Sequence, residues 1–410
     1  ENAQAFEKLV LDVLEDVAEN GIPHEKLEAV LHQLELSQRE VGGDHYPFGL
    51  QLILNGMTAA IHRSDPVSLL NLDPVIDSLR ESIKDPEFIK DLTRKLLLDN
   101  QHRVRLTLRP DENLSQRKEQ AEEQHLAAIN AAMSDEDKAR VVEQAKALEE
   151  RQSQIDDPEV LPKVGLADVP AEVRIPDSYP QSISGTDSVI YKQGTNGLVY
   201  HEIICELPSL TDEELDLLPY YSACLTELGC GDKDYLQVQE WQSSVSGGIN
   251  AQHSIRALTD DEQKTRSYFL FSGKALNRNN KKLAELMWET LDAIRFDETD
   301  RIAELITQMR SRRERSVTGN GHSLAMSAAS SGFNPVASLN HRYSGLAGIK
   351  AVKELDDSHS EKSAVEHTAS VFAAIHDKIK AAAKSYMLTL EADKVDDVVK
   401  DFESLWGSQD

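Results

Sequence analysis

One short stretch approaches the G-x-S-x-G turn that presents a nucleophilic serine, namely Gly321-His-Ser-Leu-Ala325. In that turn a strand leads into the serine, so that its hydroxyl is exposed at the top of a sheet. Here an arginine-rich helical stretch precedes Ser323, and Ala325 stands where the second glycine belongs. No Asp and His partners can be assigned from the sequence. We therefore expect a loop followed by a helix with Ser323 as its N-cap, and a serine hydrolase using Ser323 remains an alternative.

Zinc chemistry needs two histidines on one helix face, four residues apart, with a glutamate that works on the metal-bound water. None of the 13 histidines has a second histidine four positions away. The nearest string is His32-Gln-Leu-Glu35, which Leu36 follows where the second histidine would stand. Cys224 and Cys230 have no histidine nearby, so we expect them to be core cysteines. We predict no catalytic, cofactor-binding or metal-ligating residue in this chain.

The basic cluster Arg310-Ser-Arg-Arg-Glu-Arg315 ends a helical pattern whose apolar stripe includes Ile302, Leu305 and Ile306. We interpret the arginines mainly as a solvated helix face. The alternative is that they point into a peptide chamber or onto a domain outside this chain.

The composition limits the classes of partner. The chain has 410 residues, a net charge of −27 and a pI near 4.9, and a strongly acidic protein lacks the basic face that nucleic acid requires. Three cysteines are too few and too scattered for a disulfide framework and indicate a reducing compartment. No apolar run approaches the roughly 18 residues of a membrane span. We expect a cytoplasmic protein or one of another reducing soluble compartment, an organelle matrix included, without nucleic-acid or membrane partners.

A glycine-free stretch from 113 to 159 predicts an antiparallel helical hairpin. Between Glu112 and Glu159 there are 13 acidic against 6 basic residues, with narrow apolar stripes that bury little. The turn is expected near Met133–Ser134, because Ser134 followed by Asp137 can cap the second helix. Such a hairpin suits a strut between two globular bodies.

The body before the hairpin, 1–110, is predicted to be nearly all helical. The exception is the alternating segment from His102 to Leu108, which predicts a strand. One strand cannot satisfy its own backbone, so its sheet must come from elsewhere. Since the chain begins at Glu1 rather than Met, we expect it to be excised from a longer protein.

The body after the hairpin predicts an α+β domain with a mainly antiparallel sheet and helices on one face. An extended connector reaches Pro180, and two strands flank a turn signal at Gly194–Gly197. Thr211-Asp-Glu-Glu214 is a capping box at a helix start. The expected strands cover 189–192, 198–207, 249–257, 267–276 and 385–391, and the expected helices cover 211–228, 235–243, 283–294, 299–317, 322–331, 338–355, 365–383 and 395–406.

This order of elements and a series of short strings resemble the insulinase/pitrilysin-type zinc metallopeptidases, and most closely their presequence-protease clade. The strings run along nearly the whole chain and carry the resemblance by their order: Leu31-His-Gln-Leu-Glu-Leu-Ser-Gln-Arg-Glu40, Asp99-Asn-Gln-His-Arg103, Leu106-Thr-Leu-Arg-Pro-Asp111, Leu161-Pro162, Leu166-Ala-Asp-Val-Pro170, Gly197-Leu-Val-Tyr200, Pro219-Tyr-Tyr221, Thr226-Glu-Leu-Gly229, Ala325-Met-Ser327, Leu339-Asn-His-Arg342 and Ser344-Gly-Leu-Ala347.

The resemblance implies three regions: 1–111 as the helical end of a second peptidase-like domain, 112–160 as the hairpin linker, and 161–410 as a third domain. The family's zinc motif is H-x-x-E-H, and the third-domain helix at that place reads Tyr220-Tyr-Ser-Ala-Cys-Leu-Thr-Glu227, so this repeat is expected to be silent. The family's active domain also adds substrate to a strand edge, which makes the strand from Val199 to Glu206 a candidate edge.

The function implied is that of a non-catalytic central region of a zinc-dependent peptidase. The intact enzyme would degrade short unfolded peptides in a closed two-half chamber, with this region as hinge and chamber wall. Its partners would be the remaining domains of the same chain and the peptide substrates, with zinc in the missing first domain. The alternative is an inactive peptidase-like interaction or assembly subunit.

Overall fold

The computed structural model describes residues 2–42, 46–68, 70–173 and 175–407. Two compact units divide the chain, and each combines segments far apart in the sequence. The first unit comprises 1–15 and 94–175, and the second comprises 16–93 and 176–410. Helix α1 (Asn2–Asn20) begins in the first unit and ends in the second at Gly21, whose φ of +79° suits a helix stop.

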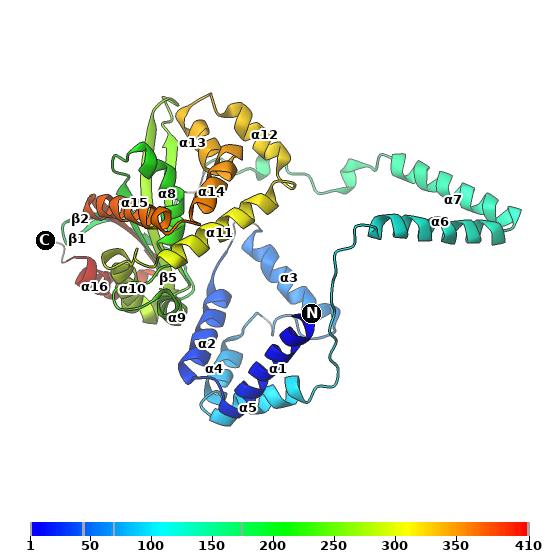
Figure 1. Cartoon of the computed structure of the whole chain (residues 1–410), viewed down its shortest axis with the longest axis horizontal. Coiled ribbons are helices and arrows are strands. Elements are labelled where there is room, and N and C mark those ends of the chain that lie inside the picture. The colour runs from blue at the N-terminus through cyan, green and yellow to red at the C-terminus, as the bar shows by residue number, and fades with distance from the viewer. Residues whose placement is uncertain (1, 43–45, 69, 174, 408–410) are drawn as a thin grey trace. The chain divides into compact units, whose positions relative to one another are not determined.

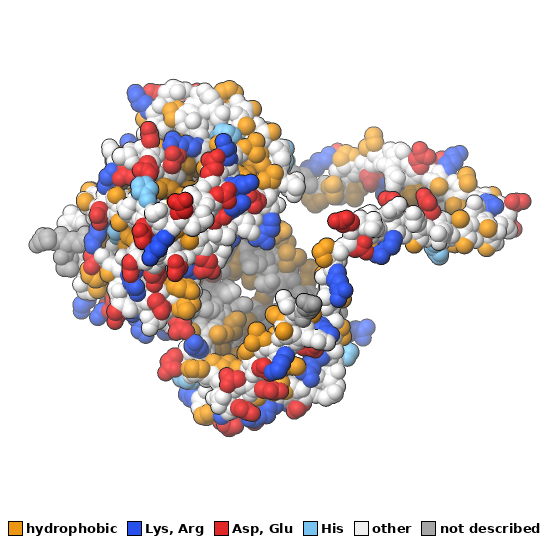
Figure 2. Space-filling view, in the orientation of Figure 1, with side chains coloured by type: hydrophobic (Ala, Val, Ile, Leu, Met, Phe, Trp, Pro, Cys, Tyr) orange, Lys and Arg blue, Asp and Glu red, His pale blue; other side chains and the backbone are white. Residues whose placement is uncertain are grey.

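The first unit contains the predicted hairpin, formed by α6 (Leu114–Ala132) and α7 (Asp135–Ser153). The chain reverses at Met133–Ser134 (Figure 1), and Ser134 and Asp137 form a reciprocal capping box. Neither helix buries a described residue, and acidic, basic and apolar side chains intermingle on the visible face (Figure 2). The predicted turn, cap and shallow burial are therefore confirmed.

The segment from His102 to Leu108 is extended but is not a strand, so that prediction was wrong for this chain. A strand is defined by backbone pairing, and no described strand pairs with this segment. Its side chains Val104, Leu106 and Leu108 are 89%, 79% and 85% exposed. The alternation that suggested a half-buried strand is present, but the surface it would bury against is not found among the described residues.

The helical part of the second unit precedes its sheet. Its helices are α2 (His24–Arg39), α3 (Phe48–Ile61), α4 (Asp73–Ser82) and α5 (Pro86–Thr93), and a π-helical turn over Arg94–Leu98, in the first unit, continues α5. Proline lies at the N-cap of α2, because its fixed φ suits a helix entry. Helix α2 buries one face, formed by Leu31, His32, Glu35 and Leu36.

The sheet of the second unit is mixed and mostly antiparallel. Its spatial order is β1-β2-β6-β3-β5-β4, and only β2 and β6 run parallel. The strands are β1 (Ser178–Ile183), β2 (Thr186–Lys192), β3 (Leu198–Glu206), β4 (Ile249–Ala257), β5 (Thr265–Leu276) and β6 (Lys384–Leu390). With its flanking helices this sheet confirms the predicted α+β class (Figure 1).

Three expectations about these strands were wrong. Strand β1 occupies the end of the predicted connector, where Pro180 is tolerated because β1 is an edge strand. Strands β2 and β3 do not pair with each other, because the distant β6 lies between them. Strand β3 therefore pairs on both sides, with β5 and β6, and cannot be a peptide-accepting edge.

Helices cover the sheet and close one large core. They are α8 (Asp212–Cys224), α9 (Tyr235–Val245), α10 (Asn280–Asp292), α11 (Thr299–Ser316), α12 (Gly321–Ser330), α13 (Pro335–Ser344), α14 (Leu346–Ser358), α15 (Lys362–Ala381) and α16 (Val395–Trp406). Tyr221 lies in this core against Phe269 and Phe372, with ring centroids 6.0 Å apart in both pairs. The helix predicted over 338–355 is two helices, since the chain turns at Gly345.

Among the described residues no helix is both long and apolar enough to cross a membrane.

Candidate functional site

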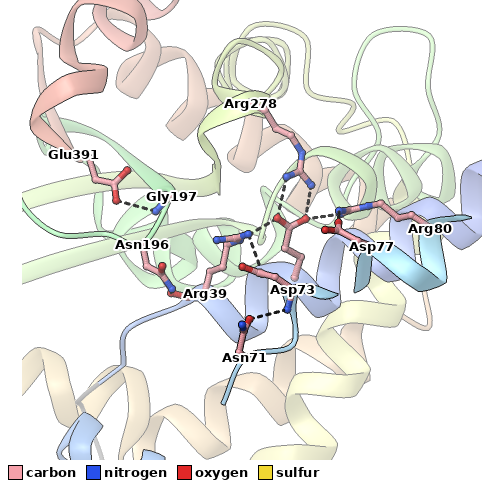
Figure 3. A network of polar contacts seen from close by, with 10 residues as sticks. Arg39, Asn71, Asp73, Asp77, Arg80, Asn196, Gly197, Arg278 and Glu391 are labelled. Atoms are coloured by element: carbon pink, nitrogen blue, oxygen red, sulfur yellow. Dashed lines mark hydrogen bonds and ion pairs between the residues drawn. The ribbon is translucent and has the colours of Figure 1, made fainter. Parts of the chain in front are cut away.

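A buried glutamate on α2 is surrounded by three arginines from separate parts of the second unit. Arg39 lies one helical turn further along α2, Arg80 lies on α4, and Arg278 lies in the short 3₁₀ helix Asn277–Asn279 after β5. Figure 3 shows how these three guanidinium groups converge. The Glu35 side chain is only 4% exposed.

The two oxygens of Glu35 accept four N–H donors. Oε1 accepts from Arg39 Nε at 2.9 Å and Arg278 Nη1 at 3.0 Å, and Oε2 accepts from Arg80 Nη2 and Arg278 Nη2, both at 2.5 Å. These bonds, with that from Arg278 the largest influence, lower the pKa of Glu35 to about 2. A carboxylate has about four lone-pair sites, so Glu35 has no free site for a metal and is too weak a base to take a proton. This arrangement is a structural clamp.

His32 lies one turn before Glu35 but does not join it in a ligand pair. Its ring is buried, and its Nε2 has no hydrogen-bond partner among the described residues. Burial, followed by the nearby positive charge of Arg278, lowers the pKa of His32 to about 4. The string from His32 to Glu35 therefore serves to pack α2 against the β-sheet part of the unit.

Further contacts hold α2 in the same place. Leu36 packs with Leu198 and Leu276 at the ends of β3 and β5. Gln33 Nε2 donates to the carbonyl of Ser246 at 2.7 Å, and Lys274 Nζ forms an ion pair with Glu40. These polar contacts lie around an apolar centre, and together they join segments more than 150 residues apart in sequence.

The helix that resembles the zinc-motif position carries core residues. Tyr221 and Cys224 of α8 are fully buried. His376 Nε2 donates to the carbonyl of Leu291 at 2.9 Å, so its Nδ1 accepts the hydrogen bond from Tyr221 Oη, also 2.9 Å long. Burial raises the pKa of Cys224 to about 12, so this thiol is inert.

The other two cysteines are also free and buried, and burial raises the pKa of Cys230 to about 11. The prediction of core cysteines at 224 and 230 is confirmed. Within the described parts of the chain, no three His, Cys, Asp or Glu side chains gather in a way that could hold a metal ion.

Ser323 is an exposed residue of α12 rather than its cap. Asn320 holds the N-cap position, so the capping prediction was wrong. The helix α11 precedes it, as expected, and the nucleophile turn is absent from this described stretch. The Ser323 hydroxyl lies 3.2 Å from Nε2 of the adjacent His322, and no described carboxylate is paired with that ring.

The arginines at the end of α11 divide into packed and exposed residues. Arg310 pairs with Asp356 at 2.8 Å and Asp357 at 2.7 Å on α14. Arg313 donates to the carbonyl of Gly348 and stacks over the Tyr220 ring. Arg310 and Arg313 therefore bind neighbouring helices of their own domain, whereas Arg312 and Arg315 are exposed, as a solvated face predicts.

Sequence reasoning missed the clamp, since Glu35 and Arg278 lie 243 positions apart. A glutamate on an otherwise apolar helix face, beside Leu31 and Leu36, was the available signal, because an isolated buried charge requires partners.

The fold and clamp define an α+β domain with a non-catalytic centre. The family model for the region associated with subfamily C of the M16 peptidases matches residues 108–355, which is more than half of the chain. The chain therefore belongs to this peptidase-associated family.

The relatives agree with that assignment. Presequence protease 1 of Arabidopsis thaliana, named as chloroplastic/mitochondrial, is 27% identical over 362 residues, covering 87% of this chain and 33% of that protein. The mitochondrial presequence protease of Xenopus laevis is 28% identical over 360 residues, covering 87% and 34%. The chain thus spans about a third of the length of these relatives.

A solved structure titled as the peptidase M16 inactive domain from Pseudomonas fluorescens is also similar. It shares 14% identity over 56% of this chain and 50% of its own, with a TM-score of 0.36, which is too low to carry an inference about function.

Proposed function

We propose that this chain is the non-catalytic central region of a zinc-dependent peptidase that degrades short unfolded peptides in a closed two-half chamber. The observation that carries the proposal is the family membership together with the coverage: the chain aligns with a third of proteins named presequence proteases. Two local findings support it. Glu35 is saturated by arginines, and the α8 helix at the place of the zinc motif contributes Tyr221 and Cys224 to the core.

The proposed partners are the remaining domains of the same longer chain. The first unit supports this with an apolar groove of about 840 Å³ between the start of α1 and the extended segment 103–108. Phe6, Val104 and Leu106 line it and are 68%, 89% and 79% exposed. An extended segment with unpaired backbone and exposed alternate apolar side chains suits incorporation into a sheet supplied by another part of the protein.

On this proposal, 1–111 ends a second peptidase-like domain, 112–160 is the hinge linker, and 161–410 is a silent third domain. The hairpin acts as a strut rather than a core, which agrees with its lack of buried residues. Zinc would be held by the first domain and not by this region. The relatives' names support an organelle matrix as the compartment.

The test is the coding sequence upstream of Glu1 together with an assay of the chain alone. We expect an H-x-x-E-H motif upstream, no stoichiometric zinc by atomic emission in this purified chain, and no cleavage of an unstructured fluorogenic peptide. Absence of the motif upstream would favour the inactive assembly subunit instead. Ester hydrolysis that is lost in Ser323→Ala would favour the serine hydrolase.

A further inference from the structure

Alternate side chains of the sheet lie on a face that the helical core does not cover. In β3, Ile203 and Cys205 belong to the core, whereas Glu202 and Ile204 are only half-buried. Met387 of the neighbouring β6 has the same intermediate exposure. Because side chains alternate across a strand, these half-buried residues share the second face of the sheet.

Glu202 lies in the middle of this second face. Its register partners are Met387 on β6 and Ser272 on β5, and Ser272 is in turn opposite Asn250 on β4. These four residues form a row across four adjacent strands, on a rigid paired backbone. A site built on such a row is held more firmly than one built on a loop.

A cavity of about 330 Å³ opens over this row. It lies wholly within the second unit and reaches from β3 to the two glycines before β4. Its side-chain lining includes Tyr200, Glu202, Asn250, Ser272 and Lys274. That volume is at the lower end of the range of ligand pockets, which suits one long side chain rather than a folded partner.

The charges in this cavity are unbalanced. Lys274 is neutralised by Glu40 of α2, but the Glu202 carboxylate makes no hydrogen bond or ion pair with any residue that the structure describes. Burial raises the pKa of Glu202, with no opposing charge to lower it. A half-buried carboxylate without a partner is costly, and a cation with several N–H donors is the group that would satisfy it.

We propose that this cavity binds the Lys or Arg side chain of an extended peptide, with Glu202 as its counter-ion and the hydroxyl of Ser272 and the amide oxygen of Asn250 as further acceptors. The aliphatic stem of the side chain lies along Met387 and Ile204, whose apolar surfaces suit it. The peptide nature of the ligand rests on the proposed function. Cation recognition rests on the cavity itself.

The test is the binding of short unstructured peptides to this chain, followed by fluorescence anisotropy. One peptide carries a single Arg in a Gly/Ser background, and its partner carries citrulline, which keeps the shape but removes the charge. We expect the Arg peptide to bind about 10-fold more tightly than the citrulline peptide, and Glu202→Gln to abolish that difference.

Glu206→Gln is the matched control, because it removes the same charge from the exposed end of the same strand and face. We expect it to keep the preference for Arg within about 2-fold. Equal losses in the two variants would indicate attraction by overall negative charge and overturn the proposal, as would equal binding of both peptides by the wild-type chain.

A second variant tests the site while the carboxylate remains. Ser272→Lys places a cation directly opposite Glu202, so the Arg preference should disappear as it does in Glu202→Gln. Retention of the preference in this variant would overturn the proposal. The result is independent of zinc and of the sequence upstream of Glu1, so the proposed function can fail while this site binds, and this site can fail while the proposed function stands.

Discussion

Two glutamates of the second unit show opposite solutions to the same problem. Glu35 is 4% exposed and accepts four N–H donors from three arginines, which lower its pKa to about 2. Glu202 is half-buried on the open face of the sheet, has no partner in the described chain, and has a raised pKa. Burial alone does not distinguish a structural carboxylate from one that can receive a ligand; the number of donors already in place does.

The difference follows from where the two residues lie. Glu35 faces the junction of α2, α4 and the end of β5, so arginines from each element can reach it. Glu202 lies in the centre of a sheet, where its register neighbours Met387 and Ser272 provide no positive charge. The predictions below test this contrast, beginning with the largest expected effect.

Glu35→Gln should destabilise the second unit by about 3 kcal/mol. It leaves three guanidinium groups without their carboxylate, and the loss falls at the lower end for buried pairs because Arg39, Arg80 and Arg278 are 28%, 26% and 52% exposed. All three tryptophans lie in this unit, so urea unfolding followed by Trp fluorescence reports on it. A loss below about 0.5 kcal/mol, the range of ordinary surface changes, would mean that the clamp contributes nothing.

Acid should remove the same contribution in the wild-type chain. Because the folded pKa of Glu35, about 2, is below its ordinary value of 4.5, its stabilisation is fully present above pH 4.5 and is lost as the pH falls toward 2. The wild type should therefore lose about 2 to 3 kcal/mol more than Glu35→Gln across this window. Urea midpoints measured at several pH values check this, and parallel curves for the two proteins would contradict it.

The arginines should rank by the bonds that they make. Arg278→Met removes two hydrogen bonds to Glu35 and the link to the sheet, and should cost about 2 kcal/mol. Arg80→Met removes one bond to Glu35 and should cost about 1 kcal/mol. The same urea measurement compares them, and an equal or reversed order would show that the bidentate contact is not the main one.

The sequence predicts the elements of this fold better than their neighbours. The bounds of α3, β4 and α16 follow from local apolar periodicity, and the Ser134 cap follows from local spacing. The insertion of β6 between β2 and β3 does not, because strand pairing depends on residues almost 200 positions apart. The failed strand at 102–108 shows the same limit: the pattern is local, but pairing requires a partner.

The site follows the same rule. The lack of an i, i+4 histidine pair can be read directly from the sequence, as can the core character of Cys224. The partners of Glu35 come from α2, α4 and the end of β5, and the isolation of Glu202 depends on what five neighbouring strands place beside it. Neither is encoded in local spacing, so both required the three-dimensional arrangement.

Glu202→Gln should have the smallest effect and the opposite sign, a gain of about 0.5 to 1 kcal/mol at pH 7. A raised carboxyl pKa means that the folded state holds its proton more tightly than the unfolded state, so ionisation at higher pH costs stability. The gain should fade as the pH falls below the ordinary value of 4.5, where both states are protonated. Glu206→Gln, at the exposed strand end, should change the urea midpoint little at either pH. A loss of stability in Glu202→Gln would reveal a partner for this carboxylate and remove the contrast with Glu35, whereas a gain would show that the chain retains a carboxylate that its own fold does not need.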